Sequence, residues 1–259
     1  MTKLKNAPVV YVLGVLRFPE LIDPRPFAAA LQARLSDLYP RQEEFTAPHF
    51  QVNIDHDGVN FTHNEITTWQ LASQDGSWAL MVNAGHIALH TNRYVDRGDF
   101  VDRFVACVLA ADIKYVHGIG LRYVDLIVPK SGERLEEYLA EGFLPADIER
   151  AGLSVQEGVY AAGYATDMGM LRVQALRRPP TVLPLELNSE ATQRGEWAPK
   201  RPDGDFAVLD VDHGAAFDAP LDMEGFDVRE RMLELHGPIR SVFDALVTDH
   251  ALKVWNGED

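Results

Sequence analysis

The chain has 259 residues, of which 46% are hydrophobic and 24% are charged. This composition is typical of a globular protein with a substantial core and excludes wholesale disorder. The net charge of −15 disfavours nucleic acid and anionic membrane surfaces as partners, because both are bound largely through Lys and Arg. Cys107 is the single cysteine, so no intrachain disulfide can form, and its place in an apolar helical pattern predicts a buried side chain.

The N-terminal segment does not have the pattern of a signal peptide. The apolar run after Pro8 is short, rich in valine and interrupted by Gly14 and Arg17. No stretch of the chain reaches the length of a transmembrane helix. We therefore expect a cytoplasmic protein that does not contact a membrane.

The first half of the chain predicts a strand, a helix, a β-meander, a second helix and a further strand. Residues 9–18 are apolar on both faces, which favours a central strand, and residues 27–38 form a helical pattern closed by Pro40. Asp57-Gly58 and Asp75-Gly76 are turn signals within the meander. The strands predicted around these turns are 50–55, 59–63, 66–72, 78–82 and 86–91. A helix over 99–113 and a strand over 121–128, introduced by Gly118 and Gly120, follow.

The second half predicts a hairpin, a further strand and a long final helix. The hairpin comprises residues 153–166 and 168–176, and residues 182–187 are expected to pair beside it. The Pro- and Gly-rich stretch 188–204 forms either a lid or a simple connection. Residues 206–213 alternate, which predicts that Asp210 and Asp212 face solvent. Apolar positions over 228–246 predict a helix that kinks or breaks at Gly237-Pro238.

These elements predict an α+β fold in which antiparallel meander sheets are covered by amphipathic helices. The order of elements divides the chain into an N-terminal half, 1–130, and a C-terminal half, 131–259, which carries the long final helix. The two halves are expected to pack as one compact unit. They are either similar α+β layers placed side by side or two parts of one large domain.

Four segments together resemble an uncharacterised, sporadically distributed bacterial protein family of about this length. They are residues 4–10 with the Leu-Lys-Asn-Ala-Pro opening, 78–94, the Gly-Leu-Arg-Tyr segment 120–127, and 235–255. Tyr11 and Gly14-Val15 depart from the pattern of the family. The resemblance implies a similar fold and length, but it transfers no active site. Sporadic distribution is associated with accessory genes such as defence loci, which is an association and carries no chemistry.

Arg122 is the most informative candidate site residue, because it lies within a strand otherwise built for burial. A half-buried arginine needs an acidic or phosphate partner to offset its desolvation. One interpretation is an internal salt bridge to Glu186 or Asp125. The other is an anion-recognition site that joins Arg122 to further residues, since guanidinium groups suit carboxylate and phosphate. The candidate anion-binding residues are Arg17, Arg93, Arg122, Tyr123 and Arg172.

Metal and cofactor chemistry have weak support in the sequence. His56, His63 and Asp55 flank a predicted hairpin, but no helical His pair, paired cysteines or phosphate-binding glycine loop occurs. His86 and His90, four residues apart on one strand, are too far apart to share a metal. We therefore interpret the strand histidines as solvent-facing and expect no metal and no cofactor. The acidic stretch 203–227 lacks the spacing of a calcium loop and is interpreted as a solvated face.

The sequence carries no catalytic signature, such as a Gly-x-Ser-x-Gly elbow or a Cys-His arrangement. The leading hypothesis is a non-enzymatic interaction protein, an accessory or regulatory subunit of a bacterial multicomponent system of the defence type. Its expected partner is another protein encoded nearby. The alternative hypothesis is a small-anion or nucleotide-binding protein, with or without enzyme activity, that uses the arginine cluster. The oligomeric state is left open.

Overall fold

The computed structural model describes residues 4–55, 58–145, 148–187, 197 and 199–258, except the side chains of 48–64, 149 and 185. Its strands form one nine-stranded antiparallel sheet in the order β2-β3-β4-β5-β1-β6-β9-β8-β7. The predicted α+β class is confirmed. The strands are β1 (Val9–Arg17), β2 (Arg41–Asp55), β3 (Gly58–Ala72), β4 (Trp78–Val82), β5 (His86–Thr91), β6 (Tyr115–Ile127), β7 (Gly158–Thr166), β8 (Gly169–Arg177) and β9 (Ala207–Asp222). The helices are α1 (Arg25–Leu35), α2 (Arg97–Ala111), α4 (Val228–Leu246) and α5 (Asp249–Asn256).

The order of strands repeats across the centre of the sheet. β1 is followed by a meander whose last strand, β5, pairs with β1, and then by α2. β6 is likewise followed by a meander whose last strand, β9, pairs with β6, and then by α4. β1 and β6 pair with each other in the middle and join both sets into one sheet. The division of the chain after residue 130 stays a prediction.

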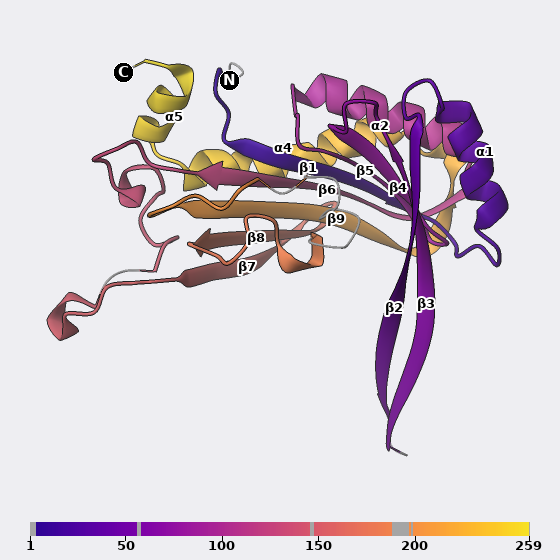
Figure 1. Cartoon of the computed structure of the whole chain (residues 1–259), viewed down its shortest axis with the longest axis horizontal. Helices are drawn as coiled ribbons and strands as arrows, with labels where there is room; N and C mark the ends of the chain where they lie inside the picture. The colour runs from indigo at the N-terminus through magenta and orange to yellow at the C-terminus, as the bar shows by residue number, and fades with distance from the viewer. Residues whose placement is uncertain (1–3, 56–57, 146–147, 188–196, 198, 259) are drawn as a thin grey trace.

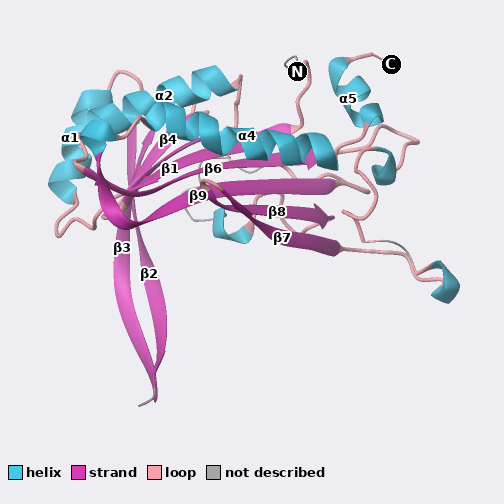
Figure 2. Ribbon diagram, turned by 180° about the vertical axis from the view of Figure 1, so that it is seen from behind, coloured by secondary structure: helices cyan, strands magenta, loops and turns pink. Residues whose placement is uncertain are grey.

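The helices α1, α2 and α4 cover one face of this sheet (Figures 1 and 2). α2 begins where the Asp96 side chain accepts a hydrogen bond from the Asp99 amide, and it ends at Asp112, whose φ of 52° is left-handed. The main core lies between these helices and the sheet and includes Phe100, Phe104 and the predicted buried Cys107. None of the helices in the described part of the chain has the length and apolar character needed to span a bilayer.

A second, smaller core lies on the opposite face of the sheet. Tyr11, Val124 and Val208 are buried there beneath Leu183 and Trp197, which belong to the connection between β8 and β9. This face is therefore covered by irregular chain, whereas the first face is covered by helices. The sheet is buried on both sides at its centre, as the two-sided apolar character of residues 9–18 predicted.

The hairpin of β2 and β3 extends away from the sheet as a two-stranded arm (Figures 1 and 2). β3 pairs with β4 only from Trp69 to Ala72, whereas its pairing with β2 runs along the whole strand. Among the described strands, residues 58–68 therefore pair with β2 alone, over roughly 35 Å at about 3.3 Å per residue. At the base of the arm, Trp69 Nε1 donates a 2.9 Å hydrogen bond to Glu44.

Several predicted boundaries were wrong. Residues 59–63 and 66–72 belong to one continuous strand, because no glycine or proline separates them. β6 begins at Tyr115, so Gly118 and Gly120 lie inside it and do not precede it. Both positions require glycine. A Cβ on Gly118 would lie 2.7 Å from the Ala215 carbonyl oxygen, and a Cβ on Gly120 would lie 3.0 Å from the Val15 side chain.

Two predictions for the second half were also wrong. Residues 182–187 form no strand and contain a single 3₁₀ turn at Leu185–Leu187. α4 continues through Pro238 and ends at Leu246, with the change of direction at Val247 before α5. Met232, Leu235 and Ile239 are buried on both sides of the proline, and their packing against the sheet holds the helix together.

Gly14 of β1 lies close to the side chains of α2 and α4. A Cβ there would lie 3.1 Å from Met232, Phe100 and Phe104. We expect Gly14→Ala to lower the free energy of unfolding by about 1 to 3 kcal/mol through overpacking. Gly225→Ala, which meets no atom within 4 Å, is the matched control. Urea unfolding that gives equal stabilities for both variants would contradict this packing.

Candidate functional site

Arg122 lies on the face of the sheet opposite the helices and is held by two carboxylates. Its Nε and Nη2 donate hydrogen bonds of 2.7 and 2.5 Å to the two carboxylate oxygens of Asp210, and Nη2 also lies 2.7 Å from Glu186. The Asp210 side chain is only 2% exposed. Burial lowers the pKa of Arg122, but the hydrogen bonds to Asp210 and Glu186 outweigh it, and the net shift of the pKa is upward. The prediction that Asp210 faces solvent was therefore wrong.

Arg172 of β8 lies in the same cross-strand row as Arg122 of β6, with Asp212 of β9 between them. Arg122 and Arg172 line a cavity of about 240 Å³ together with Asp210, Asp212 and Glu186. Two guanidinium groups thus share the cavity with three carboxylates. This balance of charge favours an internal ion-pair network over the binding of an anion.

The other predicted anion-binding residues lie elsewhere. Tyr123 follows Arg122 on β6, so it faces the helices, and its hydroxyl lies 3.2 Å from that of Tyr94. Arg17 is the last residue of β1, opposite His86 and Gly118. The structure brings together Arg122 and Arg172 and separates them from Arg17, Arg93 and Tyr123. Alternation along β6 could have revealed the separation of Arg122 from Tyr123.

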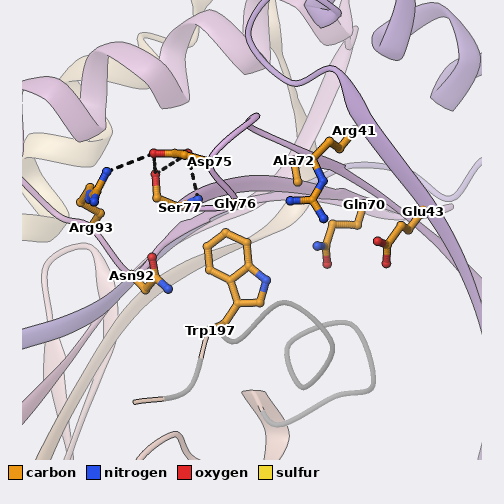
Figure 3. A pocket seen from close by; sticks show the side chains of 10 residues that line it. All are labelled: Arg41, Glu43, Gln70, Ala72, Asp75, Gly76, Ser77, Asn92, Arg93 and Trp197. Carbon is orange, nitrogen blue, oxygen red and sulfur yellow. Dashed lines mark hydrogen bonds and ion pairs between the residues drawn. The ribbon is translucent and has the colours of Figure 1, made fainter. Parts of the chain in front are cut away.

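Arg93 belongs to a different cavity, of about 580 Å³, beside the base of the arm (Figure 3). It forms a 3.1 Å ion pair with Asp75, whose pKa is lowered to about 2 by hydrogen bonds from Ser73 and Ser77. Trp197 lines the same cavity. The ion pair is exposed on both sides, so we assign it little energy.

Beneath Trp197, His90 is fully buried, with its ring 4.4 Å from the indole. Burial lowers the pKa of His90 to about 3 and that of His86 to about 4, so both rings are neutral at pH 7. The interpretation as solvent-facing was wrong for His90, because both faces of the sheet are covered there, whereas His86 is half-buried. Among the residues that the structure describes, no three His, Cys, Asp or Glu side chains gather to hold a metal ion. His56 and the side chains of Asp55 and His63 lie outside that set.

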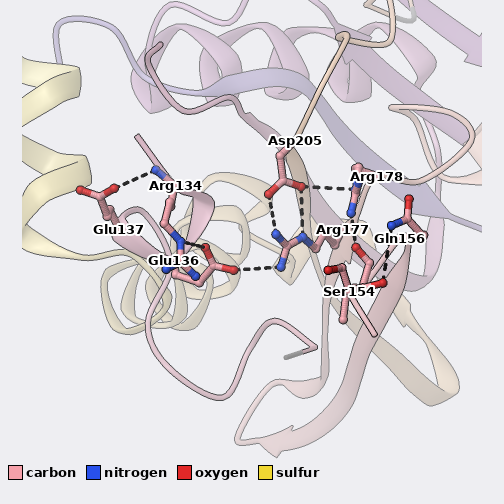
Figure 4. Close-up of polar contacts among 9 residues, drawn as sticks. Arg134, Glu136, Glu137, Ser154, Gln156, Arg177, Arg178 and Asp205 are labelled. Carbon is pink, nitrogen blue, oxygen red and sulfur yellow. Dashed lines mark hydrogen bonds and ion pairs between the residues drawn. The ribbon is translucent and has the colours of Figure 1, made fainter. Parts of the chain in front are cut away.

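A second arginine network fastens the end of β8 to the neighbouring loops (Figure 4). Arg177 donates hydrogen bonds of 3.0 and 2.5 Å to Asp205 and one of 2.9 Å to Glu136. Arg178, with a φ of 47°, lies 3.4 Å from the same Asp205 carboxylate. Both arginines are engaged with the chain itself, which indicates a structural role.

Asp125 carries a buried carboxylate, which the sequence suggested only as a partner for Arg122. It lies on the helix face of β6 and is 5% exposed. No described residue forms a hydrogen bond or an ion pair with it. Burial, aided by the charge of Asp210 and opposed by that of Arg240, raises the pKa of Asp125 from 3.8 to about 7. Unpartnered, perturbed carboxylates of this kind gather at functional sites.

Comparisons with protein-family models, with curated proteins and with solved structures found no match to this chain.

The Arg122 network generates a prediction about stability. Arg122→Ala leaves the Asp210 carboxylate buried without its partner, and we expect the free energy of unfolding to fall by about 3 to 5 kcal/mol. Arg172→Ala removes a side chain that is 67% exposed, and we expect less than about 1 kcal/mol. Equal effects of the two substitutions in urea unfolding would show that the buried pair is unimportant.

Asp125 generates a prediction about pH. A carboxylate whose folded pKa lies above its unfolded pKa is neutral and costs nothing at pH 3, and its cost grows as the pH rises from 3.8 to about 7. The difference of about three pKa units corresponds to a cost of about 4 kcal/mol above pH 7. We expect Asp125→Asn to raise the unfolding temperature at pH 8 and to leave it unchanged at pH 3.

Asp218→Asn is the matched control, because Asp218 is exposed and the substitution makes the same change in net charge. Scanning calorimetry of both variants at the two pH values isolates the contribution of burial. A stabilisation by Asp125→Asn that does not depend on pH would contradict the assigned direction of the pKa shift.

Proposed function

We propose that this protein is a non-enzymatic interaction protein that binds another protein through the β2–β3 arm. It would serve as an accessory or regulatory subunit of a bacterial multicomponent system. One observation carries the proposal: residues 58–68 of β3 pair with β2 alone, beyond the last contact with β4 at Trp69. An isolated two-stranded hairpin is at best marginally stable in water, so a long one favours a partner that adds to it.

The register of the arm separates apolar from polar residues. Val52 lies opposite Phe61 and Ile54 opposite Val59, so these four residues share one face of the ribbon. The alternate positions carry polar residues and form the other face, with Gln51 opposite Thr62, Asn53 opposite Asn60 and His49 opposite Asn64. Each large apolar side chain that a partner buries contributes about 1.5 to 3 kcal/mol. We therefore assign partner binding to the face of Val52, Ile54, Val59 and Phe61, the apolar face of the arm.

The charge of the chain favours a different protein as the partner. A net charge of −15 opposes nucleic acid and also opposes a second copy of the same acidic chain. β2 is an edge strand of the sheet, so the arm also offers a backbone edge to which a partner strand can add. A partner protein with an apolar surface and an exposed strand beside it would fit both the apolar face and the open backbone edge of the arm.

Photo-crosslinking in the source cells tests the proposal. Benzoylphenylalanine is placed at position 61, on the apolar face, or at position 62, on the polar face, as the matched control. We expect position 61 to crosslink to one other protein and position 62 to give little product. No crosslink from either position, or crosslinks only to a second copy of this chain, would overturn the proposal.

The crosslinked partner then permits a quantitative measurement with purified proteins. We expect Phe61→Ser to weaken binding by at least tenfold, which is about 1.4 kcal/mol, and Thr62→Ser to leave it within about twofold. A variant in which residues 47–66 are replaced by Asn-Gly retains the opposed Thr46 and Thr67 and supplies a favourable turn. It should unfold at the same temperature as the full chain while failing to bind.

A further inference from the structure

A cavity on the helix side of the sheet has an inner and an outer chamber. The inner chamber, of about 100 Å³, includes Tyr123, Asp125 and Phe243 in its wall. The outer chamber, of about 940 Å³, opens toward Lys5 and Arg97. Both chambers are lined by Leu4, Ala7, Val9, Tyr94, His236 and Arg240, so they adjoin each other.

The inner chamber presents a single carboxylate among aromatic rings. Asp125 has no hydrogen-bond or ion-pair partner among the described residues, and its charge reaches the hydroxyls of Tyr94 and Tyr123. The Tyr123 ring lies 5.4 Å from Tyr94 and 5.8 Å from His236, edge to face in both cases. Burial, with the charges of Arg97 and Arg240, lowers the pKa of His236 to about 4, so this ring is neutral at pH 7.

These groups suit a cation. An ammonium group forms charge-assisted hydrogen bonds with a carboxylate and is attracted to aromatic faces. The inner chamber has the volume of about three water molecules, which admits an ammonium group and one or two methylene groups. A metal ion fits less well, because Asp125 is the one carboxylate in the wall of this chamber.

The outer chamber has the opposite charge. Arg97 and Lys5 lie in its wall, and no described residue forms an ion pair with either of them. α2 begins at Arg97 beside the same space, and the Asp96 side chain caps this end of the helix by accepting a hydrogen bond from the Asp99 amide. Arg240 is neutralised by Asp244 at 2.7 and 2.9 Å. The wall also carries the carboxylates of Asp96 and Asp244, so the three cations Lys5, Arg97 and Arg240 leave an excess of one positive charge, which favours an anionic group.

We propose that this cavity binds a small linear zwitterion, an ω-amino acid. Its ammonium group lies against Asp125 in the inner chamber, and its carboxylate lies toward Arg97 and Lys5 in the outer chamber. The site is independent of the arm, so either proposal can fail without the other.

Isothermal titration calorimetry of the full chain tests this proposal with a series of increasing length: glycine, β-alanine, γ-aminobutyrate and ε-aminocaproate. Butylamine and butyrate each lack one of the two charges and serve as ligand controls. We expect one member of the series to bind at least tenfold more tightly than either control. Binding of no zwitterion at millimolar concentration, or equal binding of butylamine, would overturn the proposal.

Variants locate the site. Asp125→Asn and Arg97→Ala should each weaken the best zwitterion at least tenfold, whereas Arg93→Ala, an exposed arginine outside the cavity, should leave its affinity unchanged. Thermal unfolding of each variant establishes that it is folded. Unchanged affinity in Asp125→Asn would place the ligand elsewhere and overturn the proposal.

The pH dependence supplies a readout that a purely structural role would not move. The ammonium group needs the charged carboxylate, so affinity should fall by about tenfold for each pH unit below about 7. Affinity that stays constant from pH 5 to pH 8 would also overturn the proposal. Tyr94, Tyr123 and Arg240 share the inner chamber with Asp125, and the charge of Asp210 acts on Asp125 from the opposite face of the sheet. The charges that act on His236 are those of Arg97 and Arg240.

Discussion

The antiparallel pairing of β1 with β6 organises this molecule. Each strand begins one of the two sets of strand, meander and helix, and their pairing turns the two sets into one sheet. Glycine is needed in this strand pair at the positions where neighbouring side chains lie close to the backbone. Gly14 admits the side chains of Met232, Phe100 and Phe104, and Gly120 faces Val15 across the pair. A strand pair at the centre of a sheet is buried on both faces only if other chain segments cover each face. The helices cover one face of this pair, and the β8–β9 connection covers the other.

The same pairing explains why charged groups are buried at the centre of the sheet. Consecutive residues of a strand point to opposite faces, so Arg122 and Asp125 of β6 lie on different sides. Arg122 is matched by Asp210 on the neighbouring β9, which makes that face a closed ion-pair network. Asp125 has no such match and lies in the wall of a cavity. One strand thus carries a structural charge on one face and a free charge on the other.

The sequence predicted the type of most elements because alternation and helical spacing are local signals. Turn signals placed the first meander and the hairpin of β7 and β8 correctly. The arm was not predicted, because the length of β3 beyond β4 depends on where a different strand ends. Burial of Asp210 and His90 was also missed, since a pattern within one strand does not reveal that both faces are covered. The predicted salt bridge from Arg122 to Glu186 is confirmed. The stronger partner, Asp210, was missed because its side chain was predicted to face solvent.

The dependence of the arm on a partner can be measured directly by hydrogen exchange. Among the described strands, residues 58–68 pair with β2 alone, whereas β1 and β6 each pair with strands on both sides. In the isolated chain we expect the arm to exchange much faster than the central pair, because local opening of a ribbon costs little. In the complex with the partner we expect its exchange to slow at least tenfold while that of β1 and β6 stays the same. Equal exchange of the arm in the isolated chain and in the complex would contradict its role in binding.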